Sequence, residues 1–179
     1  TKVLCLVCNK ELAQTGASKI DIIAHSTGGL IVKKYVMDNP ADHNIDKTVF
    51  VGVPNLGAPK AIKVLVQGDN FGVLGLSDAE MKKIAQNMPV AYDLAPSPAL
   101  VDQKGSFLRT IDDYFFAPDV VTDLDYQAAW ELLIERGANE TGFTNAGEVH
   151  SPGFENFDLR TAGIDAYNLV GCKSGTIGG

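Results

Sequence analysis

The stretch DIIAHSTGGLIVKKYV, residues 21–36, places one serine between two apolar runs. The first run is short and β-branched, which is typical of a buried strand over residues 20–24. The second run predicts a helix over residues 29–38, with an apolar face made by Ile31, Val32, Tyr35 and Val36 and with Lys33, Lys34 and Asp38 opposite. Ser26 therefore lies where a strand turns into a helix.

A serine on such a turn, flanked by small residues, is typical of a nucleophile elbow. The turn strains the serine backbone, and we expect Ala24 and Gly28 to meet the need for small neighbours, while Gly29 lets the helix pack closely. The Thr27 N–H would lie at a helix N-terminus, where it can stabilise an oxyanion. We predict Ser26 as the catalytic nucleophile and the Thr27 backbone N–H as an oxyanion donor. The alternative is that Ser26 is an ordinary N-cap.

Strand and helix patterns alternate along the chain. A second buried strand is predicted over 47–53, a short helix over 60–67, and a buried strand again over 166–172, while residues 3–14 fit either a strand or a helix. This alternation predicts the α/β class, with a parallel sheet of about three strands.

The middle of the chain has a different character. Ser77-x-x-Glu80 is a capping box that predicts a helix over 77–87, and a second capped helix is predicted over 122–136. Prolines interrupt the rest, and residues 138–154 are rich in loop formers. We predict a core segment over 1–69 with the elbow, a largely helical cap insertion over 70–164, and a returning core strand and loop over 165–179.

The middle region also has a surplus of apolar residues. They form either the core of the cap or a groove for an acyl chain, and they are Val64, Leu65, Val66, Phe71, Val73, Leu74, Leu76, Phe107, Leu108, Phe115 and Phe116.

Composition limits the classes of function. The chain has 179 residues, 45% hydrophobic, with a net charge of −7 and no long basic run, so we expect a globular protein without a nucleic-acid partner. The apolar runs are too short for a transmembrane helix. The chain begins at Thr1, so we expect a processed or excerpted chain, and the sequence leaves secreted and cytoplasmic locations open.

No metal or organic cofactor is expected. Cys5 and Cys8 form a C-x-x-C pair, but without a second pair of ligands we interpret them as small buried hydrophobes. The carboxylates of residues 112–125 lack the spacing of a calcium loop, and we interpret them as a solvated face that caps helices.

Two segments carry a family resemblance. Residues 24–29 (AHSTGG) and 53–59 (VPNLGAP) resemble the elbow and the following strand end of the α/β-hydrolase superfamily, nearest to its lipase and lecithin:cholesterol acyltransferase-like group. Residues 91–98 (AYDLAPSP) are similar to a cap segment of that group, and residues 167–179 resemble the strand and loop that resume its sheet. Ala24 stands where Gly is commoner. The resemblance is specific over 15–60 and weak outside these segments.

The resemblance implies a triad in the order Ser, Asp, His. Ser26 matches the nucleophile and Thr27 the oxyanion residue, whereas the acid and base would follow Gly179 and the second oxyanion donor would precede Thr1. We do not assign the base to any histidine of this chain. His25 would point away from the serine, His43 is expected on a solvated loop at the far sheet edge, and His150 in the cap.

The sequence thus predicts a serine hydrolase acting on carboxylic esters with an apolar acyl part, through an acyl-enzyme on Ser26. An acyltransferase or thioesterase of the same fold, and a non-catalytic lipid-binding or interaction domain with a relic elbow, are the alternatives. The expected partner is a small-molecule ester or lipid. Because open sheet edges expose unpaired backbone, we also expect self-association or association with the rest of the domain.

Overall fold

The computed structural model describes residues 2–112 and 120–171, which form two compact units. The first unit contains residues 2–55 and 151–171, and the second contains residues 56–112 and 120–150. The chain passes from the first unit to the second near residue 55 and returns to the first near residue 150. The sequence predicts the corresponding domain boundaries at residues 69 and 164.

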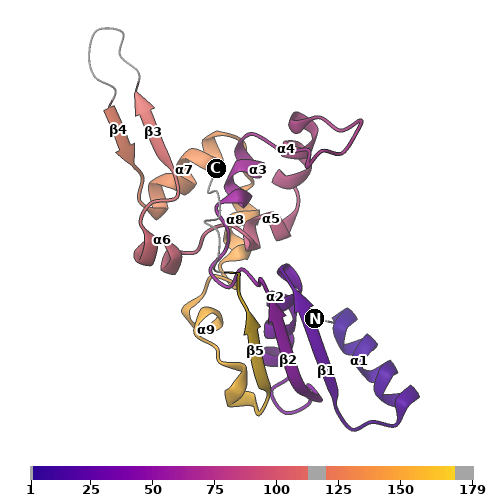
Figure 1. The fold of residues 1–179 in the computed structure, drawn as a ribbon. Helices are drawn as coiled ribbons and strands as arrows, with labels where there is room; N and C mark the ends of the chain where they lie inside the picture. The colour runs from indigo at the N-terminus through magenta and orange to yellow at the C-terminus, as the bar shows by residue number, and fades with distance from the viewer. Residues whose placement is uncertain (1, 113–119, 172–179) are drawn as a thin grey trace. The chain divides into compact units, whose positions relative to one another are not determined.

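A parallel sheet forms the centre of the first unit (Figure 1). Its three strands are β1 (Ile20–His25), β2 (Ile45–Val51) and β5 (Asp165–Leu169), in the order β1-β2-β5. Both pairings are parallel, which confirms the predicted α/β class and the three-stranded sheet. Because the strands are parallel, their carboxyl ends lie at one edge of the sheet, where α/β proteins place their sites.

Helices of the first unit are α1 (Lys2–Thr15), α2 (Thr27–Asp38) and α9 (Pro152–Glu155), with a 3₁₀ helix η1 over Leu159–Ala162. Residues 3–14, which fitted either a strand or a helix, are helical. The core packs one face of the sheet against α1, α2 and η1 and contains Ala24, Val32, Tyr35, Val36, Ile45, Phe50, Leu159 and Ile164.

The predicted polar face of α2 is wrong at one residue. Lys33 is only 4% exposed, and its ammonium donates a hydrogen bond to the carbonyl oxygen of Glu155 (3.0 Å) and lies 4.9 Å from the Phe154 ring centroid. Ile31, predicted on the apolar face, is exposed. Lys33 therefore joins α2 to α9, because its long side chain reaches a backbone acceptor that sequence spacing does not reveal.

The second face of the sheet is exposed. Three sets of residues that pair across β1, β2 and β5 lie on this face. They are Asp21–Lys47–Asp165, Ile23–Val49–Tyr167 and His25–Val51–Leu169. Ile23 is 78% exposed and Leu169 is 59% exposed. The prediction of buried strands is therefore wrong for one face of β1 and β5, since side chains alternate between the two faces of the sheet and only one face is covered.

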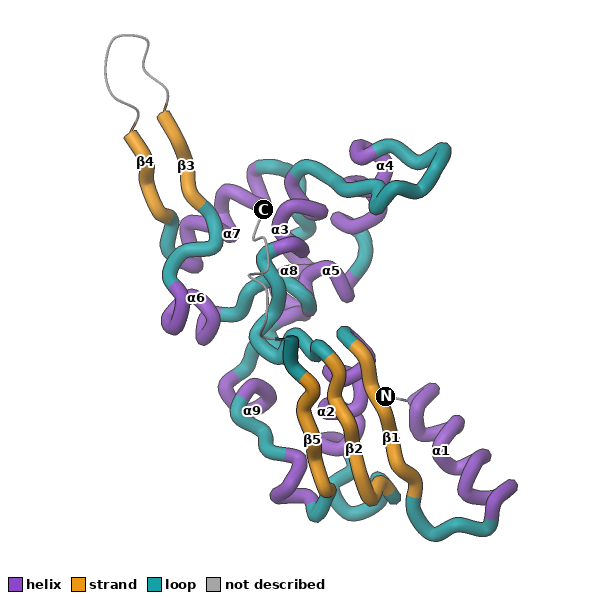
Figure 2. Tube along the Cα trace, viewed as in Figure 1, coloured by secondary structure: helices purple, strands orange, loops and turns teal. Residues whose placement is uncertain are grey.

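The second unit is largely helical (Figure 2), as predicted for the cap. Its helices are α3 (Lys60–Val66), α4 (Asp78–Gln86), α5 (Pro89–Asp93), α6 (Pro98–Lys104), α7 (Tyr126–Glu135) and α8 (Glu140–Ala146). Its core surrounds Trp130, which lies 4.5 Å from Phe143 and 6.2 Å from Tyr92 between ring centroids.

The capping box of α4 is confirmed. The Ser77 hydroxyl accepts from the Glu80 N–H, and the Glu80 carboxylate accepts from the Ser77 N–H (2.8 Å). The loop prediction for residues 138–154 is wrong in part, because α8 and α9 begin there behind the caps Asn139 and Ser151. Prolines also start helices here: Pro89, Pro98 and Pro152 stand in the first turn, where the missing N–H costs no hydrogen bond.

A β-hairpin replaces the start of the second predicted helix. Strands β3 (Arg109–Asp112) and β4 (Val120–Asp123) pair antiparallel, and α7 begins later, capped by the Asp125 carboxylate (2.8 Å to the Ala128 N–H). The β-branched residues Val121 and Thr122 prefer this extended pairing. Asp125 fits the predicted capping role, while Asp123 forms an ion pair with Arg109. Phe115 and Phe116 lie outside the described residues.

Among the helices that the structure describes, none has the length and apolar character needed to cross a bilayer.

Candidate functional site

Ser26 occupies a strained turn between β1 and α2. Its backbone has φ 52° and ψ −131°, a left-handed φ that a residue other than glycine adopts rarely. The Ser26 N–H donates to the Val51 carbonyl oxygen (3.0 Å), and the Ser26 carbonyl accepts from the Gly29 N–H (3.0 Å). Hydrogen bonds to β2 and to the first turn of α2 thus hold the turn.

The alternative role of Ser26 as an ordinary N-cap does not fit this geometry. Ser26 stands at the N-cap position, but its side chain makes no capping hydrogen bond, and its backbone lies outside the extended region that capping residues adopt. Ser77, Ser97 and Ser151 show the contrast, since each is extended and each accepts an amide hydrogen bond from its helix.

Thr27 begins α2, so its N–H has no acceptor within its own helix. The amide lies directly after Ser26, at the positive end of the helix dipole. The arrangement offers one backbone donor beside the serine for negative charge that develops on a reacting oxygen.

The two glycines after Thr27 differ in their surroundings. A Cβ on Gly29 would lie 2.3 Å from Cγ2 of Val53, so the close packing expected at Gly29 is present. A Cβ on Gly28 would meet no atom outside its own helix within 4 Å. The described residues therefore show a steric need for glycine at position 29 and none at position 28.

The loop after β2 begins at the same edge of the sheet as Ser26. Gly52 has φ 55°, and its N–H donates to the Leu169 carbonyl oxygen at the end of β5 (3.1 Å). Backbone hydrogen bonds thus join the turn at Ser26 to the end of β2, and the loop after β2 to the end of β5.

In the second unit, two of the segments that carried the resemblance lie side by side. The Ser97 N–H donates to the Leu56 carbonyl oxygen (3.0 Å), and the Ala58 N–H donates to that of Leu94 (2.8 Å). Between these bonds a Cβ on Gly57, which has φ 85°, would lie 2.0 Å from the Ala95 carbonyl oxygen. Glycine is therefore required there by both space and conformation.

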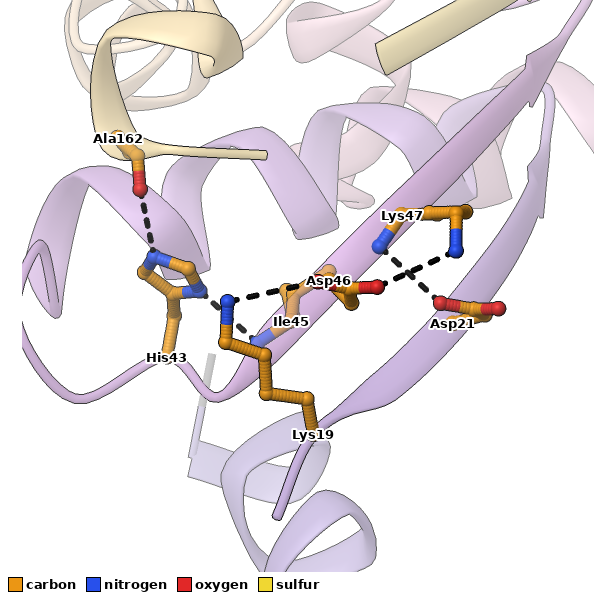
Figure 3. Close-up of polar contacts among 7 residues, drawn as sticks. All are labelled: Lys19, Asp21, His43, Ile45, Asp46, Lys47 and Ala162. Atoms are coloured by element: carbon orange, nitrogen blue, oxygen red, sulfur yellow. Dashed lines mark hydrogen bonds and ion pairs between the residues drawn. The ribbon is translucent and has the colours of Figure 1, made fainter. Parts of the chain in front are cut away.

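His43 is buried, which contradicts its predicted place on a solvated loop (Figure 3). It is 7% exposed, its Nδ1 accepts from the Ile45 N–H (3.0 Å), and its Nε2 lies 3.2 Å from the Ala162 carbonyl oxygen. This pattern requires the neutral tautomer with the proton on Nε2. His43 precedes β2, at the sheet edge away from Ser26 as expected, and both of its ring nitrogens make hydrogen bonds to the backbone.

The other histidines have different surroundings. His25 has an exposed side chain on the uncovered face of the sheet. His150 is 8% exposed in the second unit, where its Nε2 lies 3.2 Å from the Tyr92 carbonyl oxygen, a hydrogen bond of the kind expected within the cap. Nearby, burial raises the pKa of Asp93, Glu148 raises it further, and His150 opposes the shift.

The cysteine pair lies within α1. Cys8 is buried, which raises the pKa of its thiol, and Cys5 is partly buried. Within residues 2–112 and 120–171, no three His, Cys, Asp or Glu side chains gather closely enough to hold a metal ion.

The apolar surplus of the middle region divides by burial. Val64 and Leu65 belong to the core of the second unit, and Val66, Phe107 and Leu108 pack against it. Phe71, Val73 and Leu74 are exposed. Some of these apolar residues therefore form the core of the second unit, and others are exposed at its surface.

Comparison with known proteins supports the resemblance. The family model of lecithin:cholesterol acyltransferase matches residues 6–140, most of the chain. A phosphatidylcholine-sterol acyltransferase of Mus musculus is 26% identical over 132 residues, which cover 70% of this chain and 30% of that protein. Its counterpart from Rattus norvegicus is 26% identical over 137 residues, with the same coverage. The chain thus spans about 30% of the length of the curated relatives it matches, and it belongs to the lecithin:cholesterol acyltransferase family.

Proposed function

We propose that this chain carries the nucleophile of a serine enzyme that acts on carboxylic esters with an apolar acyl part. One observation carries the proposal: Ser26 takes a left-handed φ of 52° at the turn from β1 into α2. Such strain persists where the surrounding structure enforces it, and it is concentrated at functional sites. The family match supports lipid esters as the substrate class.

In the proposed reaction, Oγ of Ser26 attacks the ester carbonyl carbon while its proton passes to a base. The ester C–O bond then breaks, the alcohol leaves with a proton, and the acyl group stays on Oγ. The Thr27 N–H stabilises the negative oxygen of the tetrahedral intermediate. Water then attacks the acyl-enzyme, which releases the acid and returns a proton to Ser26.

An alcohol acceptor is the second candidate for the last step. The matched relatives are named as acyltransferases, so transfer of the acyl group to an alcohol, giving a new ester, is favoured by that comparison. The resemblance also implies an acid and a base that follow Gly179, so the experiments use the full-length protein.

The test is labelling by a fluorophosphonate probe, with hydrolysis of p-nitrophenyl esters in parallel. We expect Ser26→Ala to lose the label and about 10³-fold or more of the rate. The exposed Ser18, in the same unit, provides the control, and Ser18→Ala should keep both. Labelling that survives in Ser26→Ala would reject Ser26 as the nucleophile. A folded wild-type protein without label or turnover would favour the relic elbow.

A second arm separates the two acceptors. With a labelled phosphatidylcholine as acyl donor, an added long-chain alcohol or sterol should give a labelled ester if the enzyme is a transferase. If only free acid forms at every acceptor concentration, the enzyme is a hydrolase.

A further inference from the structure

A groove of about 440 Å³ opens on the surface of the second unit beside α3. This volume lies within the range of about 300–1,000 Å³ that is typical of small-molecule sites. The apolar part of its lining is made by Ile62 and Val66 of α3 together with Phe107 and Leu108. Ile62 is 5% exposed, so the apolar part is anchored in the core of the unit.

Cationic side chains of the same helix also line the groove. They are Lys60 and Lys63, and each ammonium lies near the same carboxylate oxygen of Asp69, at 3.7 Å and 3.6 Å. Their side chains are 63% and 48% exposed, so both ammonium groups remain accessible to a ligand. Among the residues that line the groove, two cations face one anion, which leaves a positive charge beside an apolar wall.

The loop after α3 holds these charges in position. Asp69 accepts the Phe71 N–H (2.9 Å), and this hydrogen bond, followed by Lys60 and Lys63, lowers the pKa of its carboxyl group, which stays ionised. The Lys60 ammonium also lies 4.8 Å from the Phe71 ring centroid. Lys60 is therefore oriented by an anion and an aromatic face before any ligand binds.

We propose that this groove binds a long-chain fatty acid as its anion. The acyl chain lies along Ile62, Val66 and Leu108, and the carboxylate contacts the ammonium groups of Lys60 and Lys63. Asp69 balances only one of the two lysine charges, and the carboxylate of the ligand balances the other. A single acyl chain then covers the apolar residues of the groove. A flat lipid surface fits less well, because the apolar side chains line a hollow. The proposed binding does not rest on the role of Ser26.

Binding is measured by titrating the chain with a fluorescent long-chain fatty acid below its micelle concentration, followed by competition with unlabelled ligands. We expect oleate to compete at least tenfold better than oleyl alcohol, which has the same chain without the charge. Phosphatidylglycerol vesicles without added fatty acid should not carry the protein down on sedimentation. Equal competition by the alcohol, or co-sedimentation of the protein with the vesicles, would overturn the proposal.

Variants test the charged and the apolar lining of the groove separately. Lys60→Glu with Lys63→Glu should weaken oleate binding at least tenfold, whereas the double Arg variant should retain it, and Lys104→Glu, exposed on α6, should change nothing. Val66→Asp should also weaken binding, with circular dichroism reporting whether the unit stays folded. Unchanged binding in the double Glu variant would reject the site. Ser26→Ala should bind oleate normally. The outcome of the binding experiment is therefore independent of the outcome of the catalytic experiment.

Discussion

A Cβ added to Gly29 would lie 2.3 Å from Cγ2 and 2.6 Å from Cγ1 of Val53, closer than two non-bonded carbon atoms can approach. The first turn of α2 therefore reaches the segment after β2 only because residue 29 has no side chain.

From this contact we expect Gly29→Ala to destabilise the chain by about 1–3 kcal/mol, as overpacked cores do. Gly28→Ala is the matched control, because it removes a glycine from the same helix without a clash and should stabilise by about 0.5–1 kcal/mol. Urea unfolding measures both changes. Equal effects of the two variants would contradict the packing described here.

The second prediction concerns Gly57. Gly57→Ala would bring a Cβ to 2.0 Å from the Ala95 carbonyl oxygen and would place Ala at φ 85°. We expect a loss of about 2–4 kcal/mol, because steric overlap and backbone strain add. Gly72→Ala, also at positive φ but with open space around it, isolates the conformational part and should cost about 1 kcal/mol. If both variants lose the same stability, the contact with Ala95 is not tight.

The third prediction tests the buried Lys33. Its ammonium donates to the Glu155 carbonyl and lies over the Phe154 ring, so Lys33→Ala should cost about 1–3 kcal/mol. Lys34→Ala is the control, because the pair of Lys34 with Asp38 is half exposed and should contribute about 0.5 kcal/mol or less. Thermal unfolding gives the comparison. If the Lys33 variant is as stable as the Lys34 variant, the contacts of Lys33 do not hold α2 and α9 together.

The fourth prediction is a dependence of stability on pH at Asp93. Burial, which acts most strongly, and Glu148 raise the pKa of its carboxyl group, against the opposing effect of His150. The folded state thus holds this proton more tightly than the unfolded chain. The resulting stabilisation is complete below the unfolded pKa of about 3.9 and is lost as pH rises through the raised folded pKa.

Asp93→Asn should therefore have a higher Tm than wild type at pH 7, and the difference should shrink as the pH falls toward 4. Asp102→Asn, on the exposed part of α6, serves as the control. A difference in Tm that stays constant with pH would show that ionisation of Asp93 is not its cause.

The sequence was sufficient for features encoded by neighbouring residues. The turn at Ser26, the capping box of Ser77 and Glu80, and the alternation that gives a parallel sheet each depend on a short window. Lys60 and Lys63 were not predicted as a pair, because their significance depends on Phe107 and Leu108, which line the same groove from a distant part of the sequence.

Features that depend on distant residues were not predictable. Lys33 is buried because its acceptor on Glu155 lies 122 residues away, and His43 is buried because its partner on Ala162 lies 119 residues away. The hairpin of β3 and β4 pairs Thr110 with Thr122, and a local helix pattern concealed it. Periodicity records which side chains share a face, but it does not record what covers that face.

The two close-packed glycines have opposite consequences for how this chain can diverge. The obstacle at Gly29 is a side chain, so a smaller residue at position 53 would make room for alanine, and the two positions should covary among homologues. The obstacle at Gly57 is the carbonyl group of Ala95, which every amino acid carries. No single exchange elsewhere removes it, so position 57 should remain glycine even in lineages in which residues 29 and 53 have changed together.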